Sequence, residues 1–194
     1  MATQIGILPQ SFALAVHDLS QFDWDPRILV AELEPPAKLA AHTAALDADV
    51  LEGGEPVGSG RLILLHEPDG NEAWQGDFRC VTFARADVSP DMVEDPFLAQ
   101  VGWSWLMDAL ESRGAKYVAA SGTVTTTAST PFGGIEDRQA TSEIEIRASW
   151  TPLLDPSHPF TDHVAAWQVL LREVCGLPAD NEVISLNHRI AARR

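Results

Sequence analysis

Side chains that can bind a metal ion gather in one short stretch, residues 66–72 (HEPDGNE). A metal site needs ligands that converge on one point, either at fixed helical spacing or in a loop such as that of the EF-hand. This stretch has neither pattern, whereas its Pro-Asp-Gly run is typical of a tight turn between strands. We therefore expect a polar hairpin loop here and no metal site.

The candidate nucleophiles do not match the patterns of known catalytic motifs. Ser59 stands between two glycines, but it precedes a predicted strand, and a hydrolase places its serine at a strand-to-helix turn. Cys80 and Cys175 have apolar neighbours and no CxxC pattern, so we expect buried, reduced thiols. The glycine-rich motifs that hold nucleotide phosphates are also missing from the sequence. We therefore expect no cofactor.

The strongest candidate site is one face of a predicted β-sheet. Along each strand, charged and hydroxyl side chains that point to this face alternate with apolar side chains that point to the other face. The candidate binding face comprises Asp77, Arg79, Arg85, Thr123, Thr125, Glu143, Glu145 and Arg147. Such a face is usually solvated, and its cross-strand charge pairs each contribute only a few tenths to about 1 kcal/mol. The apolar residues Val81, Phe83, Ile63 and Leu65 lie on or near the same face and favour a cover, either another element or a partner.

The six tryptophans divide into a group on inward faces and one exception. Periodicity places four of them in the core: Trp74, Trp105, Trp150 and Trp167. Trp103 lies off the apolar stripe of its predicted helix. We expect it either to contact a partner or to pack under a loop.

Hydrophobic periodicity predicts helices near both ends and in the middle of the chain. Apolar residues at helical spacing predict helices over 9–19 and from Thr161 to Gly176. Ser89-Pro90-Asp91 predicts the start of a further helix, which Pro96 restarts or kinks and which runs to Arg113. Asp25-Pro26 resembles an N-cap followed by proline at the first helical position, which predicts a further helix that ends before Pro35. Alternating and apolar runs predict strands over 48–51, 60–66, 73–87, 116–129 and 140–150, while 39–46 is expected to be a turn or short strand.

The order of these elements is helices, three strands, helix, two strands, helix. Strands that follow one another in runs predict an α+β fold with an antiparallel sheet of about five strands and helices packed mainly on one face. We expect residues 25–178 to form a single domain, preceded by an N-terminal helix or extension at 1–24. Residues 179–194 are expected to be a mobile C-terminal tail.

Composition excludes several classes of partner. The 194 residues carry a net charge of −15. A protein that binds duplexes needs clustered Lys and Arg, so we expect no direct contact with nucleic acid, and anionic membrane surfaces are disfavoured in the same way. No apolar stretch approaches the roughly 20 residues of a membrane helix, and no positive charge precedes the N-terminal apolar run. These properties predict a cytoplasmic protein that does not bind membranes.

Four runs of residues resemble a known family: GDFRCVT at 76–82, VGWSWL at 101–106, SGTVT at 121–125 and EIEIRASWTP at 143–152. They are similar to an uncharacterised actinobacterial family catalogued as domain of unknown function 3000. The resemblance extends from about Asp25 to Pro178. It implies an actinobacterial cytoplasmic origin, often beside a ribonuclease D-like gene, and it supplies no activity or site residues.

Three hypotheses for the function remain. The preferred one is a non-enzymatic binding or adaptor protein, which uses the candidate binding face or Trp103 to bind a protein partner or a second copy of the chain. The alternative is a small-molecule enzyme, with a site built from Arg79, Glu143, Glu145 and Arg147. The third, implied only by the resemblance, is an accessory protein that contacts a ribonuclease D-like enzyme rather than its RNA.

Overall fold

The computed structural model describes residues 8–35 and 38–177. One antiparallel sheet of six strands, in the order β1-β2-β3-β4-β6-β5, forms its centre. The strands are β1 (Ile28–Leu33), β2 (His42–Glu52), β3 (Glu55–Asn71), β4 (Gly76–Asp87), β5 (Tyr117–Ser129) and β6 (Thr141–Pro152). The predicted α+β class with an antiparallel sheet is confirmed, with one strand more than expected.

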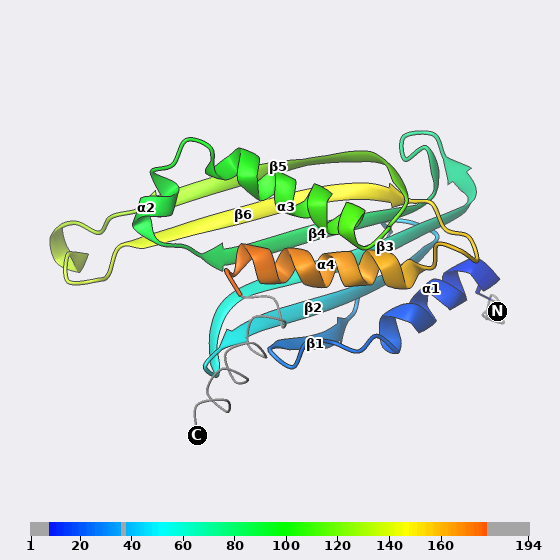
Figure 1. Ribbon diagram of the computed structural model, residues 1–194, viewed down its shortest axis with the longest axis horizontal. Coiled ribbons are helices and arrows are strands. Elements are labelled where there is room, and N and C mark those ends of the chain that lie inside the picture. The colour runs from blue at the N-terminus through cyan, green and yellow to red at the C-terminus, as the bar shows by residue number, and fades with distance from the viewer. Residues whose placement is uncertain (1–7, 36–37, 178–194) are drawn as a thin grey trace, which may run out of the picture.

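The helices of the described residues are α1 (Gln10–Ser20), α2 (Pro90–Val93), α3 (Leu98–Ser112) and α4 (Phe160–Val174), with a 3-10 turn at Gly133–Ile135. Figure 1 shows α1, α3 and α4 in front of the sheet, so that all three cover the same face. Within the described residues no helix lies over the opposite face, which we call the open face.

The helices pack on the face that the alternation predicts. The buried side chains beneath them include Leu62, Leu64, Cys80, Ala84, Ile144, Ile146 and Trp150. Trp150 and Trp167 are fully buried as expected. Trp74 and Trp105 are only half-buried, because Trp74 lies in the turn before β4 and Trp105 lies at the edge of the buried stripe of α3. The prediction of a core position was therefore wrong for these two.

Glycines in β3 let α4 approach the sheet closely. A Cβ atom on Gly60 would lie 2.4 Å from Cδ2 of Leu171, and one on Gly58 would lie 2.4 Å from Sγ of Cys175. Real Cβ atoms do not come so close to another heavy atom, so larger residues here would push α4 away. The close approach places Trp167 directly over the middle of β4.

Residues 25–34 contain β1 and not the predicted second helix. Asp25 does not cap a helix: its carboxylate accepts hydrogen bonds from the backbone and the guanidinium of Arg27 and lies 3.6 Å from Nη1 of Arg172. The bond from the Arg27 side chain is the main reason that the pKa of Asp25 lies below its usual value. The backbone N–H of Asp25 donates to Oε1 of Gln168 in α4 at 2.7 Å. These long-range contacts hold the segment extended along β2.

Other element boundaries differ from the predictions in smaller ways. Residues 42–52 form the single strand β2, which joins the expected turn or short strand at 39–46 to the predicted strand at 48–51. β3 continues through the predicted Pro-Asp-Gly turn to Asn71, and the chain turns at 72–75 instead. The expected tail at 179–194 lies outside the described residues.

Candidate functional site

The open face carries a groove with a volume of about 990 Å³. The side chains along it come from β2, β3, β4, β6 and β5, and they belong to the residues that alternate with the core. Those that define the groove are Asp47, Asp49, Ser59, Arg61, Ile63, Val81, Phe83, Ser121, Thr123, Arg147 and Ser149. The groove therefore runs across the strands of the sheet and not along one of them.

Two rows of side chains form the groove. The first row follows the register from β2 to β5 and consists of Asp47, Arg61, Phe83, Arg147 and Thr123. The second row lies beside it, and its members that line the groove are Ile63, Val81, Ser149 and Ser121. The buried Ala45 of β2 continues this row in register with Ile63. Adjacent strands are about 4.8 Å apart, so each row spans roughly 19 Å.

Paired charges fix the first row. The guanidinium of Arg61 donates to both carboxylate oxygens of Asp47, at 2.7 and 3.0 Å, and this bond raises the pKa of Arg61. Arg147 lies 2.8 Å from a carboxylate oxygen of Glu145, with its guanidinium carbon 5.8 Å from the centre of the Phe83 ring. Exposed pairs of this kind contribute little to stability. These pairs leave the first row with a carboxylate, that of Asp47, at its β2 end and a cation, Arg147, near its β5 end.

The second row changes in character along its length. Ala45, Ile63 and Val81 are apolar, whereas Ser149 and Ser121 carry hydroxyl groups. One end of the groove floor can therefore bury apolar groups, while the other end offers hydrogen bonds.

Arg79 contacts the hydroxyl end of the second row and is only 9% exposed. Its Nη2 donates to Oγ of Ser149 at 2.6 Å and to Oγ of Ser121 at 3.2 Å. Its Nη1 donates to the carbonyl of Ala119 at 2.9 Å and to Oγ1 of Thr151 at 3.1 Å. All four of these acceptors are neutral. Burial lowers the pKa of the guanidinium. Arg79 is thus a hydrogen-bonded cation whose acceptors include no carboxylate.

An irregularity in β5 completes the surroundings of Arg79. The register between β5 and β6 shifts between Val118 and Ser121, and Ala119 has a φ of +52°. This left-handed conformation is unfavourable for a residue with a Cβ atom, and residues in it are enriched at functional sites and in turns. The bulge turns the carbonyl of Ala119 towards Arg79, so the strained backbone and the buried cation form one unit.

The structure divides the predicted binding face into separate groups. Arg85 forms an ion pair of 2.9 Å with Glu143, and Arg147 pairs with Glu145, while Arg79 contacts neither glutamate. The four residues of the proposed enzyme site are therefore not brought into one cluster. Of the eight predicted residues, Thr123 and Arg147 line the groove.

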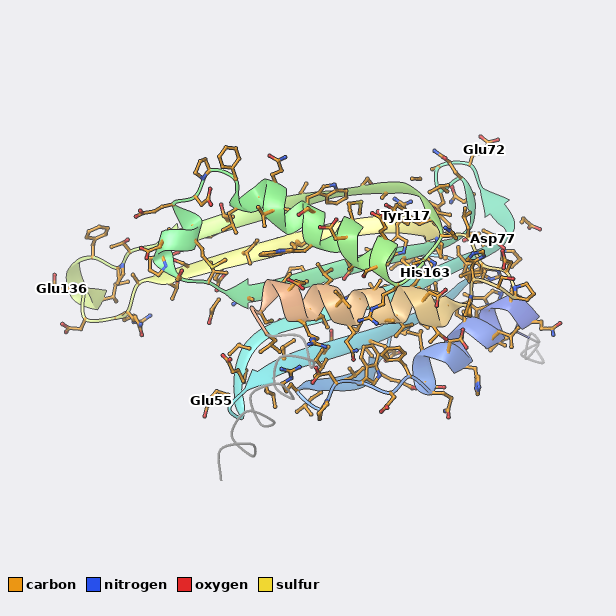
Figure 2. The ribbon with its side chains drawn as sticks, in the orientation of Figure 1. Glu55, Glu72, Asp77, Tyr117, Glu136 and His163 are labelled. Carbon is orange, nitrogen blue, oxygen red and sulfur yellow. The ribbon has the colours of Figure 1, made fainter. Side chains whose placement is uncertain are left out.

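Six of the eight predicted residues do not line the groove, and Asp77 and Thr125 are two of these. Asp77 lies at the end of the sheet where the β3–β4 hairpin turns, beside Glu72, and Figure 2 shows this end far from Glu136 in the β5–β6 loop. A carboxylate oxygen of Asp77 is 3.8 Å from Nε2 of the buried His66. Thr125 faces Glu145 on the next row of the sheet.

The prediction placed Ile63 of β3 on or near this face, but it missed β2 and the charged residue of β3. Asp47, Asp49 and Arg61 form one wall of the groove, although none of them was expected there. A signal was present, because residues 46–50 (LDADV) alternate between apolar and acidic side chains in the manner of a half-buried strand.

Trp103 packs inside the molecule and not on the open face. A Cβ atom on Gly122 would lie 2.8 Å from the ring of Trp103, so the half-buried indole rests on β5 from the helical side. Gly122 leaves the space that the ring occupies. Trp103 therefore supports the strand that carries Ser121 and Thr123.

The buried His163 and the two cysteines do not line the groove. Nδ1 of His163 accepts a hydrogen bond from the indole of Trp150 at 3.1 Å, and burial lowers the pKa of His163 to about 4. Burial also raises the pKa of Cys80, and it raises that of Cys175 to about 12, so both free cysteines remain protonated thiols. Among the described residues no group of three or more His, Cys, Asp or Glu is placed to hold a metal ion.

Comparisons with known proteins give one match. A family model described as a protein of unknown function, DUF3000, matches residues 8–184. Searches against curated proteins and against solved structures found no match. None of the helices in the described part of the chain has the length and apolar character needed to cross a membrane.

Proposed function

Since the chain belongs to the DUF3000 family, whose description assigns no function, we propose a role from the geometry of the groove. The protein is a non-catalytic binding protein, and its open face receives an extended segment of a partner protein. The observation that supports this role is the pair of rows that crosses the sheet from Asp47 to Thr123 and from Ala45 to Ser121.

The composition of the groove favours binding over catalysis. Nucleophilic and acid–base catalysis usually need a nucleophile or a histidine within hydrogen-bond reach of a second titratable group. The residues that line the groove include neither His nor Cys. Two carboxylates line it, those of Asp47 and Asp49, and that of Asp47 is engaged by Arg61. Apolar side chains flanked by a few polar groups at fixed positions are typical of binding sites.

The shape and charge of the groove favour a peptide segment. A strand rises by about 3.3 Å per residue, so a row of roughly 19 Å accommodates an extended segment of about six residues. Arg61 and Arg147 are each paired with a carboxylate, which leaves no cationic strip for a nucleic-acid backbone. An extended segment can instead place apolar side chains on Ile63, Val81 and Phe83.

The test is a selection of random peptides on the full-length protein, followed by titration of the selected peptides. The groove variant Phe83→Glu introduces a charge into the apolar floor and should weaken binding at least tenfold. The matched control is Leu14→Glu, which introduces the same charge at an exposed position of α1, where Leu14 is 58% exposed. Equal binding to the wild-type protein and to Phe83→Glu would contradict the proposal.

A second copy of the chain is a further partner that one specific observation favours. β5 is an edge strand of 13 residues (YVAASGTVTTTAS) without a charged residue or a proline, whereas β1 at the other edge has only 6 residues. Long uncharged edges readily pair with another strand, and charged residues block such pairing. We expect a dimer in light scattering after size exclusion, and Thr126→Lys should convert it to a monomer. A monomer for the wild-type chain at high concentration would reject this pairing.

A further inference from the structure

We propose that the groove binds a carboxylate attached to an apolar group, as the C-terminal residue of a partner protein presents it, at the end where β6 meets β5. This inference rests on the proposed function and names the ligand chemistry of the same groove. It is carried by Arg79 and by the two serines above it.

Arg79 makes the serine hydroxyls available as donors towards the groove. Nη2 of Arg79 donates to Oγ of Ser149 and of Ser121, so a lone pair of each oxygen is already occupied. A hydroxyl that accepts a bond in this way retains its own hydrogen for donation. The two oxygens are 3.4 Å apart, so at most one of these hydrogens is used between them. At least one O–H therefore remains free to donate a hydrogen bond to a ligand. If the ligand replaces the hydrogen bond between the two serines, both hydroxyls can donate to it.

The charge of Arg79 favours an anionic ligand. The four hydrogen-bond acceptors of this buried guanidinium are neutral, so the cation has no bonded counter-ion within the described residues. A charge in a poorly solvated position is stabilised strongly by an opposite charge nearby. A carboxylate carries one negative charge, which balances the charge of this one guanidinium, and its oxygens accept hydrogen bonds from hydroxyl donors.

The neighbours of the two serines explain why the carboxylate is attached to an apolar group. Val81 lies directly opposite Ser149 in the register of β4 and β6, about 4.8 Å away across the sheet. Phe83 follows on the same strand and also lines the groove. The C-terminal residue of a peptide carries both groups, because its apolar side chain and its carboxylate are separated by a similar distance. Capture of a terminal carboxylate by a group of donors is an established mode of peptide recognition.

The experiment uses the full-length protein and two probes that differ in one group. N-acetyl-Ala-Leu-Leu with a free terminal carboxylate should bind at least tenfold more tightly than the same peptide with a terminal amide. Ser149→Ala removes one donor and should weaken the free acid about tenfold, with little effect on the amide, since hydrogen bonds to charged groups are the stronger ones. Thr127→Ala is the matched control, because Thr127 is exposed on the same face of β5 but outside the groove.

Further arms separate the possible failures. Arg79→Gln should abolish the preference for the free acid over the amide. Circular dichroism spectra show whether this variant folds. If it does not fold, Ser149→Ala still tests the proposal. Equal binding of acid and amide, with both weakened by Phe83→Glu, would overturn the carboxylate site and leave the peptide groove intact. If Phe83→Glu does not change the binding of either peptide, both the carboxylate site and the peptide groove are overturned. Octanoate that competes as well as the peptide acid would show that the site takes small carboxylic acids and not protein termini.

Discussion

The indole of Trp167 donates a hydrogen bond of 2.9 Å to Oγ1 of Thr82, which joins α4 to the middle of the sheet. The hydroxyl of Thr82 in turn donates to the carbonyl of Arg61 in β3 at 3.0 Å. Both side chains are buried, with Trp167 at 0% and Thr82 at 2% exposure. A polar link at the centre of the core therefore fixes the helix relative to the strands whose other face forms the groove.

Replacement of Thr82 by valine should destabilise the protein. The variant Thr82→Val keeps the volume but leaves the buried N–H of Trp167 without an acceptor, at a cost of about 1–3 kcal/mol. Urea unfolding followed by circular dichroism measures this change in the free energy of unfolding. The matched control is Thr125→Val on the exposed face of β5, which should change stability by less than about 0.5 kcal/mol. If Thr82→Val is as stable as the wild-type protein, the bond does not hold α4 in place.

The contact between Trp103 and β5 predicts a second loss of stability. A Cβ atom on Gly122 would lie 2.4 Å from the carbonyl oxygen of Arg147 and 2.8 Å from the Trp103 ring. Gly122→Ala should therefore cost about 1–3 kcal/mol, because a strand backbone and a packed indole must both move. Gly134→Ala is the control, since a Cβ atom there meets no heavy atom within 4 Å. Thermal unfolding of the two variants provides the comparison, and equal melting temperatures would show that the ring does not rest on Gly122.

The buried imidazole of His163 predicts a loss of stability in mild acid. Its pKa is about 4 in the folded protein, against 6.5 for the reference value. As the pH falls from about 6.5 to about 4, the unfolded chain therefore binds a proton that the folded chain does not, and stability decreases by about 3 kcal/mol. His163→Gln should remove this part of the pH dependence, although it also alters the bond to Trp150.

The measurement is the free energy of unfolding of both proteins between pH 7 and pH 4. His66, whose pKa is also lowered by burial, is present in both and cancels in the comparison. Parallel curves for the wild-type protein and His163→Gln would mean that His163 is not the titrating group.

The sequence predicted which face of each strand is buried more reliably than it predicted long-range contacts within the chain. Alternation in residues 76–87 and 141–152 identified the buried and open sides correctly, because one face of each strand packs under helices. It failed at residues 25–34, where Asp25-Pro26 has the local pattern of a helix start. The decisive contacts there come from Gln168 and Arg172, more than 140 residues away in the chain. No local pattern contains that information.

The candidate site could be predicted only in part, because its geometry also depends on contacts between distant segments of the chain. Arg79 was correctly assigned to the open face by alternation, but its burial depends on the bulge at Ala119, which follows from pairing with β6 and not from residue types. The grouping into two rows depends on register, which a strand sequence alone does not specify. Asp47 and Arg61 could therefore be recognised as partners only after β2 and β3 were paired.

The location of the ligand is the central claim, and nuclear magnetic resonance tests it most directly. Nitrogen-15-labelled full-length protein is titrated with N-acetyl-Ala-Leu-Leu that has a free carboxylate, and the shifts of the backbone amides are followed. We expect the largest shifts at Val81, Phe83, Ser121 and Ser149, together with saturation at one site. Shifts concentrated on α3 and α4, on the opposite side of the sheet, would contradict the assignment of the open face as the binding surface.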